Sequence, residues 1–422
     1  MKTFKNPSIL LLFLFVLLNG HNPFLRFFYL FPSSISYIIW IIIFIIFNIT
    51  INNKIKKTIF VSLFFIILYV IFSIKFYGNQ SVGRIIQLIA NISLGLLVIN
   101  YYKHTLLNNI EIVLKFICHY SIIIWGFIVL LKIFFNFTLF DSIPTFFLFP
   151  DNETVDVNTH AIFHNFRGSG NLGDFSFLRN SGLLWEPGAL SGTVLMLYLM
   201  LFINKEIRKN FDYLFFLVCI TVFSTLSILG ITIISIIVLF KLIKNEKGFK
   251  FISFKSVIAT VLIFFSIQYF LDDDTALRKK VDFQLYSLVN EKRGWEGNRL
   301  GSAIFILDFI DSRNKNKGVG FFTDYNIVMS QLSNYGYQSD HPIGNGFFLM
   351  ILQLGIYLSI VFFIFLFFQL YKYYKEIVTA LFVFIVLILL LQGEVWSNYG
   401  LIYMFLFLHL STNVEKINSV SE

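Results

Sequence analysis

The sequence has few charged residues. Asp, Glu, Lys and Arg make up 14% of its 422 residues, whereas soluble domains average about 25%. Hydrophobic residues make up 57%, above the range of roughly 45–50% that is usual for soluble domains. This balance excludes an ordinary soluble protein and predicts an all-α polytopic membrane protein.

Cysteine, metal ligands and nucleotide-binding signals are also scarce. The two cysteines, Cys118 and Cys219, both lie in apolar runs, which excludes a disulfide framework and a cysteine-rich metal site. His160 and His164 are four residues apart but have no third ligand nearby, so we predict no metal. No glycine-rich phosphate loop follows a predicted strand, and we therefore expect no cofactor.

The net charge of +9 does not indicate a nucleic-acid partner. The lysines lie in short loops between apolar runs and have few aromatic residues among them, as expected for topology signals. About twelve runs approach the roughly 20 residues that a bilayer requires. They lie at 7–20, 35–51, 57–74, 84–102, 112–137, 188–204, 211–227, 229–243, 251–271, 346–370, 376–392 and 398–411.

The basic loops predict the orientation of these spans. Alternate short loops carry the cations and should be cytoplasmic, which places both termini there. Residues 1–20 resemble a signal peptide without a cleavage site, so we interpret them as a retained anchor. The chain then divides into a transmembrane bundle of about five spans, a first long outward loop, central helices, a second long outward loop, and a C-terminal membrane segment with a short tail. These parts are residues 1–137, 138–187, 188–271, 272–345 and 346–422.

The most informative stretch closes the first long loop, from Arg179 to Gly188. It combines one cation with one carboxylate, Glu186, beside Trp185 and Pro187, which is what a site for an anionic, sugar-bearing lipid needs. The alternative is an ordinary loop that enters a helix, with Pro187 in the first turn and Glu186 facing the positive helix end. Ionisable pairs do not recur at span centres, which argues against an ion-coupled transporter.

The second long loop is predicted to hold amphipathic helices that lie on the membrane. Its segment around Gly297 leads into a helix that begins near Arg299, and Gly318-Val-Gly320 is expected to be a turn. The loop ends with His341 and Asn345 directly before an apolar run. His341 should therefore lie level with the lipid headgroups.

Three motifs resemble one family. They are Arg179-x-x-Gly-x-x-x-Glu186-Pro, then Gly297-Asn-Arg299-Leu followed by a helix and Gly-Val-Gly, and a His or Asn at the loop exit before an apolar run with Gly355-Ile. The chain is similar here to the bacterial O-antigen polymerase and O-antigen ligase superfamily. Pro-Ile-Gly separates His341 from Asn345, so either residue matches the exit position.

The resemblance implies a GT-C-like glycosyltransferase in the bacterial inner membrane, acting at its outer face. Its substrate would be an undecaprenyl diphosphate-linked oligosaccharide, and a chain-length regulator protein is a candidate partner. Arg179 and Arg299 would bind the diphosphate. His341 is the preferred base and Glu186 the orienting residue, although the roles can be exchanged. Further substrate contacts are assigned to Asn345, Trp185 and Arg167.

The same resemblance leaves other functions open. The transfer would be inverting and independent of metal if it is direct. An O-antigen ligase would use the same donor but a lipid A core acceptor. A flippase or exporter for the lipid-linked oligosaccharide is a third class, and a structural membrane subunit is a fourth.

Overall fold

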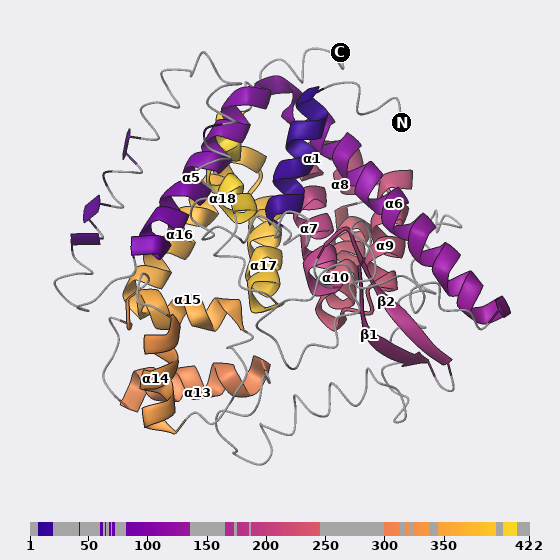
Figure 1. Ribbon diagram of the computed structural model, residues 1–422. Coiled ribbons are helices and arrows are strands. Elements are labelled where there is room, and N and C mark those ends of the chain that lie inside the picture. Colours follow the sequence, from indigo (N-terminus) through magenta and orange to yellow (C-terminus); the bar gives the residue numbers. More distant parts are fainter. Residues whose placement is uncertain are drawn as a thin grey trace. The chain divides into compact units, whose positions relative to one another are not determined.

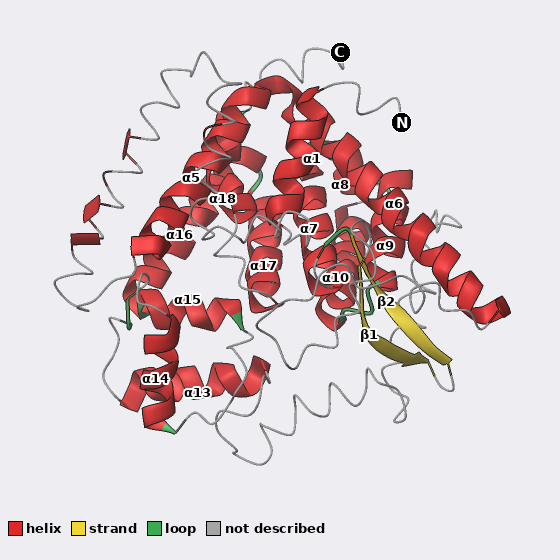
Figure 2. Cartoon of the chain, viewed as in Figure 1, coloured by secondary structure: helices red, strands yellow, loops and turns green. Residues whose placement is uncertain are grey.

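The computed structural model is mostly helical (Figure 2). It describes residues 7–19, 42, 60–61, 64, 67–68, 70–71, 82–135, 165–172, 175–184, 187–244, 299–312, 318–320, 325–336, 345–393 and 400–411. The chain forms two compact units, one of Met1–Phe27 with Asn108–Phe283 and the other of Phe28–Leu107 with Gln284–Glu422. Each unit is described by itself.

The first unit holds a helical bundle and one hairpin (Figure 1). Its elements are α1 (Pro7–Asn19), α6 (Leu106–Phe135, whose first two residues belong to the second unit), β1 (Asn165–Leu172), β2 (Phe175–Gly182), α7 (Pro187–Met200), η4 (Leu201–Ile203), α8 (Lys205–Lys209), α9 (Tyr213–Ser224) and α10 (Ile228–Lys244).

The hairpin corrects the expectation of an all-α chain. β1 and β2 pair antiparallel, with Leu172 opposite Phe175 and Asn165 opposite Gly182. The register shifts twice near the open end of the hairpin. Both strands fall inside the predicted first long loop, where no strand was expected.

Helix α7 is the centre of the first unit. It is buried along almost its whole length and contacts β2, α9 and α10. Small residues allow this close packing, because a Cβ atom on Gly230 of α10 would lie 3.0 Å from the Ser191 Cβ of α7. Small side chains at helix contacts are typical of packing inside membranes.

The second unit contains the remaining described elements. They are α5 (Val82–Tyr102), η3 (Lys103–Thr105), α13 (Arg299–Ser312), α14 (Tyr325–Tyr335), α15 (Gly346–Leu354), α16 (Ile356–Tyr374), α17 (Ile377–Gly393), α18 (Gly400–Phe407) and η7 (Leu408–Leu410). Helix α16 packs on α17, and α18 packs on α5. Figure 1 shows α13 and α15 side by side, running across the direction of α16.

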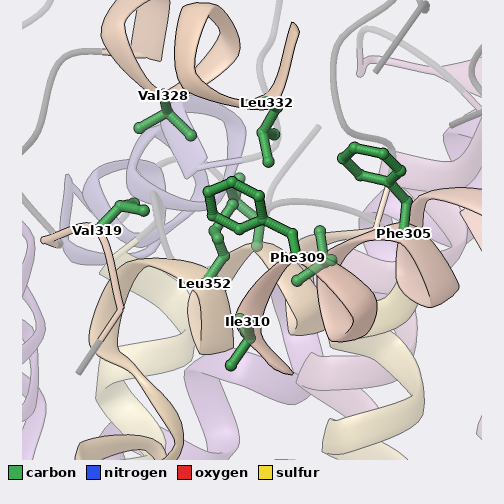
Figure 3. Packing of buried hydrophobic residues seen from close by; sticks show 9 residues of the cluster. Phe305, Phe309, Ile310, Val319, Val328, Leu332 and Leu352 are labelled. Carbon is green, nitrogen blue, oxygen red and sulfur yellow. The ribbon is translucent and has the colours of Figure 1, made fainter. Parts of the chain in front are cut away.

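A separate hydrophobic core joins α13, α14 and α15 (Figure 3). Phe305 and Phe309 of α13 lie against Leu332 of α14 and Leu352 of α15, with Val319 closing one side. The helices of the second long loop are thus packed together on apolar faces. Such cores stabilise mainly by removing apolar area from water, at about 25 cal/mol per Å².

Hydropathy predicted several helix positions well. The runs at 7–20, 84–102, 188–204, 211–227, 229–243, 376–392 and 398–411 all coincide with helices. The run 346–370 was predicted as one span, but it is broken at Gly355 into α15 and α16. The runs 35–51, apart from residue 42, and 251–271 lie outside the described residues, as does most of 57–74.

Two stretches of described helix are long and apolar enough to cross a membrane. One is Ile85–Leu131, which passes through α5, η3 and α6, and the other is Ile356–Tyr374 in α16. Other apolar helices, such as Tyr213–Ser224, are shorter. The predicted number of about twelve spans stays a prediction.

Candidate functional site

Arg179 lies near the end of β2, where the hairpin meets the helices of the first unit. Its side chain is half-buried, and its Nε–H donates to the carbonyl oxygen of Thr225 at 3.1 Å. Thr225 belongs to the short turn between α9 and α10. This hydrogen bond holds the guanidinium at the point where the two helices reverse direction.

The neighbouring residue, Asn180, joins three elements. Its fully buried amide donates from Nδ2 to the Ser224 hydroxyl of α9 at 2.8 Å and to the Ser121 carbonyl of α6 at 3.3 Å. Its Oδ1 accepts the N–H of Gly182 at 2.9 Å. Because both ends of the amide are used, Asn180 fixes the end of β2 against α6 and α9.

Gly182 has to be a glycine for two reasons. Its φ of +55° is a conformation that other residues rarely adopt. A Cβ atom at this position would also lie 2.4 Å from the Ser121 Oγ. The strand can therefore approach α6 closely only because residue 182 has no side chain.

The turn between α9 and α10 is polar and buried. Thr225 and Ser227 stabilise it, since the Thr225 hydroxyl donates to the Val222 carbonyl at 2.7 Å and accepts the Ser227 N–H at 3.2 Å. The Ser227 hydroxyl accepts the Gly230 N–H at 3.3 Å. Leu226 has a φ of +48°, so the backbone breaks sharply here.

Two further hydroxyls increase the polarity around this turn. The Oγ atoms of Ser121 and Ser181 are buried and have no hydrogen-bond partner among the described residues. Buried hydroxyls usually have partners. The end of β2 thus brings a cation, an amide and unsatisfied hydroxyls to one place. We call Arg179, Asn180, Ser121, Ser224 and Thr225 the hairpin site.

The hairpin site is suited to an anion. Helix α7 begins at Pro187, soon after β2 ends, and it contacts β2. The first N–H groups of a helix have no partner inside it and carry partial positive charge. Arg179 lies half-buried on the strand that contacts α7, and a guanidinium in such a setting favours a phosphate or carboxylate group.

The other predicted site residues are only partly covered. Glu186, Trp185 and His341 lie outside the described residues. Arg167 falls in β1 and Arg299 begins α13, but their side chains are not among those described. Arg179 belongs to the first unit and Arg299 to the second, so their joint binding of one diphosphate stays a prediction.

Asn345 has a structural role as the N-cap of α15. It is buried and caps α15, with its Oδ1 accepting the N–H of Phe348 at 3.2 Å. Asparagine is among the preferred residues at this position. The cap explains why an asparagine stands directly before the apolar run.

Gly318 and Gly320 do more than form a turn. The N–H groups of Val319 and Gly320 donate to the carbonyls of Leu352 and Gln353, at 2.8 and 3.0 Å. These carbonyls belong to the last turn of α15, where helical partners are missing. We call the segment 318–320 the glycine clasp. It supplies hydrogen-bond donors to the backbone carbonyls at the break between α15 and α16.

No group of three or more His, Cys, Asp or Glu that could hold a metal is found within the described part of the chain.

Sequence reasoning missed three residues of the hairpin site, Asn180, Ser121 and Thr225. The signal for Ser121 and Thr225 was a polar residue inside an apolar run, whereas Asn180 lies next to Arg179 in the polar loop.

No family model matches the sequence, and no curated protein matches it either.

Proposed function

We propose that the protein is a membrane-embedded glycosyltransferase of the C type that polymerises lipid-linked oligosaccharide. It transfers the growing glycan from undecaprenyl diphosphate to a sugar hydroxyl of another lipid-linked repeat unit. The observation that carries the proposal is the hairpin site, where the Arg179 guanidinium is anchored to the Thr225 carbonyl at 3.1 Å in a buried polar setting. In this proposal about twelve spans surround the site.

The length of α9 supports a ligand carried by lipid. Its 12 residues extend about 18 Å, well short of the roughly 30 Å of a hydrocarbon core. Lys205, Lys209 and Lys244 lie near the opposite end of the helix pair, which favours the inner side for that end. The Thr225 turn then lies below the outer surface, where the diphosphate of a membrane-anchored carrier is accessible.

The proposed reaction requires charge neutralisation and proton transfer. The acceptor hydroxyl oxygen bonds to the anomeric carbon as the bond from that carbon to the diphosphate oxygen breaks. The diphosphate leaves with the electron pair, and Arg179, with Arg299 as the second predicted cation, neutralises its charge. The hydroxyl proton passes to His341 or Glu186, and such general base catalysis typically contributes about 10²–10⁴-fold. Direct transfer inverts the anomeric configuration.

The test is reconstitution in liposomes with lipid-linked repeat units, scored as a ladder of polymer lengths. Arg179→Ala should lower the turnover rate by about 10²–10³-fold, as expected for loss of one preorganised donor to developing negative charge. Arg179→Lys should recover only part of it, because lysine has no bidentate donor fork. Lys205→Ala, an exposed cation of the same unit, is the control and should keep full activity. Equal ladders for wild type and Arg179→Ala would refute the proposal.

The helix interruption at Gly355 favours a second candidate, an exporter or flippase for the same lipid-linked oligosaccharide. Transporters often place broken helices around their substrate site, and Gly355 divides one apolar run into α15 and α16. A strain lacking an exporter accumulates repeat units on the inner side of the membrane. A strain lacking a polymerase carries single repeat units on its surface, and one lacking a ligase attaches none to lipid A core.

A further inference from the structure

Lys241 is a cation buried deep in the first unit, far along α10 from the hairpin site. Its side chain has an exposed fraction of 0%. A lysine at the end of an apolar helix usually extends its ammonium toward water. Lys244, three residues further on, is only half-buried, so position on the helix does not account for the burial of Lys241.

The ammonium of Lys241 is bound by main-chain carbonyls. Its Nζ donates to the carbonyl oxygen of Ile207 and, at 2.6 Å, to that of Asn210. These residues lie in and directly after α8. Carbonyls at the end of a helix lack helical partners and carry partial negative charge, so they suit a cation.

Four aromatic rings surround the same ammonium. Its Nζ lies 5.0 Å from the ring centre of Phe215, 5.5 Å from Tyr198, 5.6 Å from Phe202 and 5.9 Å from Phe211. Rings within about 6 Å attract a cation through their electron-rich faces. The rings also contact one another, with centres 5.3 Å apart for Tyr198 and Phe202 and for Phe211 and Phe215.

The charge is not balanced by a close carboxylate. Within the described part of the chain, no Asp or Glu oxygen lies within 4.0 Å of the Lys241 Nζ. The nearby Asp212 caps α9, where its Oδ1 accepts the Phe215 N–H at 2.9 Å. Carbonyl dipoles and ring faces are therefore the direct partners of this ammonium.

We propose that these four rings and two carbonyls form an ammonium-binding cage whose ligand is the chain's own Lys241. The cage fastens the end of α10 to α8 and to the rings of α7, η4, α9 and Phe211, which lies just before α9. Helix α9 bears Phe215 in its first turn and Ser224 at its last residue. The cage thus holds the far end of the helix pair whose turn binds Arg179, and it recognises a primary alkylammonium.

Chemical rescue tests this cage. Lys241→Ala removes three methylenes and the ammonium, which n-propylammonium replaces. We expect the variant to unfold at a lower temperature in detergent, and n-propylammonium to raise its midpoint saturably while 1-propanol does not. Lys244→Ala, on the same helix, should show no response to n-propylammonium. Equal effects of the amine and the alcohol, or a Lys241→Met variant as stable as wild type, would show that only the hydrocarbon stem matters.

Amine labelling of the wild-type protein keeps the proposal testable if Lys241→Ala does not fold. With a water-soluble acylating reagent and peptide mass spectrometry, Lys244 should be modified while Lys241 is protected. Tyr198→Phe keeps the ring and removes a buried hydroxyl that has no hydrogen-bond partner among the described residues, so it should preserve both protection and stability. Tyr198→Leu should lose both. Equal labelling of the two lysines in wild type would overturn the cage.

Discussion

The helices are interrupted in two places, and different groups supply the hydrogen bonds at each interruption. Between α9 and α10, the side chains of Arg179, Asn180 and Thr225 donate or accept hydrogen bonds in addition to the local backbone bonds of the turn. Between α15 and α16, main-chain N–H groups of the glycine clasp satisfy the carbonyls of Leu352 and Gln353. Backbone groups at a helix break require such partners wherever they are buried away from water.

The difference predicts different tolerance to substitution. A break closed by side chains depends on particular polar groups, so it should be sensitive to the loss of those groups. A break closed by backbone requires close approach and therefore glycine. The side-chain closure also brings a cation to the break, whereas the three residues of the glycine clasp have no charged side chain. This supports the placement of ligand chemistry at the first break and of a structural joint at the second.

The largest effect should come from Gly318→Ala in the glycine clasp. Its φ is +76°, and a Cβ atom would lie 2.4 Å from the Gly355 nitrogen and 2.7 Å from the Leu352 oxygen. Backbone strain and overpacking together should lower the free energy of unfolding by about 2–6 kcal/mol. Equilibrium unfolding of the purified protein in mild detergent would measure the loss.

Gly336→Ala separates the two contributions. Its φ of +113° is also unfavourable for alanine, but nothing lies within 4 Å of the added Cβ. Only the strain of about 1–3 kcal/mol should therefore appear. If Gly318→Ala were no worse than Gly336→Ala, the clasp would not need the close approach that the structure shows.

The next largest effect should come from Asn180→Ala at the hairpin site. The substitution leaves the buried Gly182 N–H without its acceptor, whereas the Ser224 hydroxyl loses one donor but still donates to the Thr221 carbonyl. An unsatisfied buried group costs about 1–3 kcal/mol, so we expect a loss of about 1–3 kcal/mol in the same unfolding experiment. Ser235→Ala, which removes a hydroxyl bonded only within α10, is the control and should change stability little.

A smaller effect is expected for Thr225→Val in the turn itself. Valine keeps the shape but loses the hydroxyl that donates to Val222 and accepts the Ser227 N–H. The Thr225 carbonyl that binds Arg179 remains. Stability should fall by about 1 kcal/mol, while polymer synthesis in liposomes should persist. Loss of synthesis at unchanged stability would indicate that the hydroxyl itself contacts substrate.

The sequence predicted the helices better than the breaks between them. Hydropathy located α7, α9 and α10, because a long apolar run differs clearly from its polar flanks. It could not locate the break at Gly355, since the flanking segments are mostly apolar and each partner amide lies 33 residues before the carbonyl that it binds. Hydropathy also missed the hairpin, whose strands lie in a polar loop.

The candidate site was predictable only in part for the same reason. Arg179 stood out as a cation in a glycine-punctuated loop, but its acceptor in α9–α10 is a backbone carbonyl 46 residues away. Every residue has a backbone carbonyl, so the sequence does not indicate which carbonyl accepts this hydrogen bond. Asn345 was visible, yet the resemblance favoured a chemical role, whereas an asparagine before an apolar run also matches a helix cap.

The smallest effect should come from Gly126→Ala in the interior of α6, and its sign should be opposite. Gly126 lies in an unbroken helix, and an added Cβ would meet nothing within 4 Å. Alanine is favoured over glycine inside a helix by roughly 0.5–1 kcal/mol, so the unfolding midpoint should rise slightly. A decrease would mean that a partner surface approaches this glycine in the folded protein. An increase would sharpen the contrast with Gly318, because the same added methyl group stabilises an unbroken helix and disrupts a helix break closed by backbone.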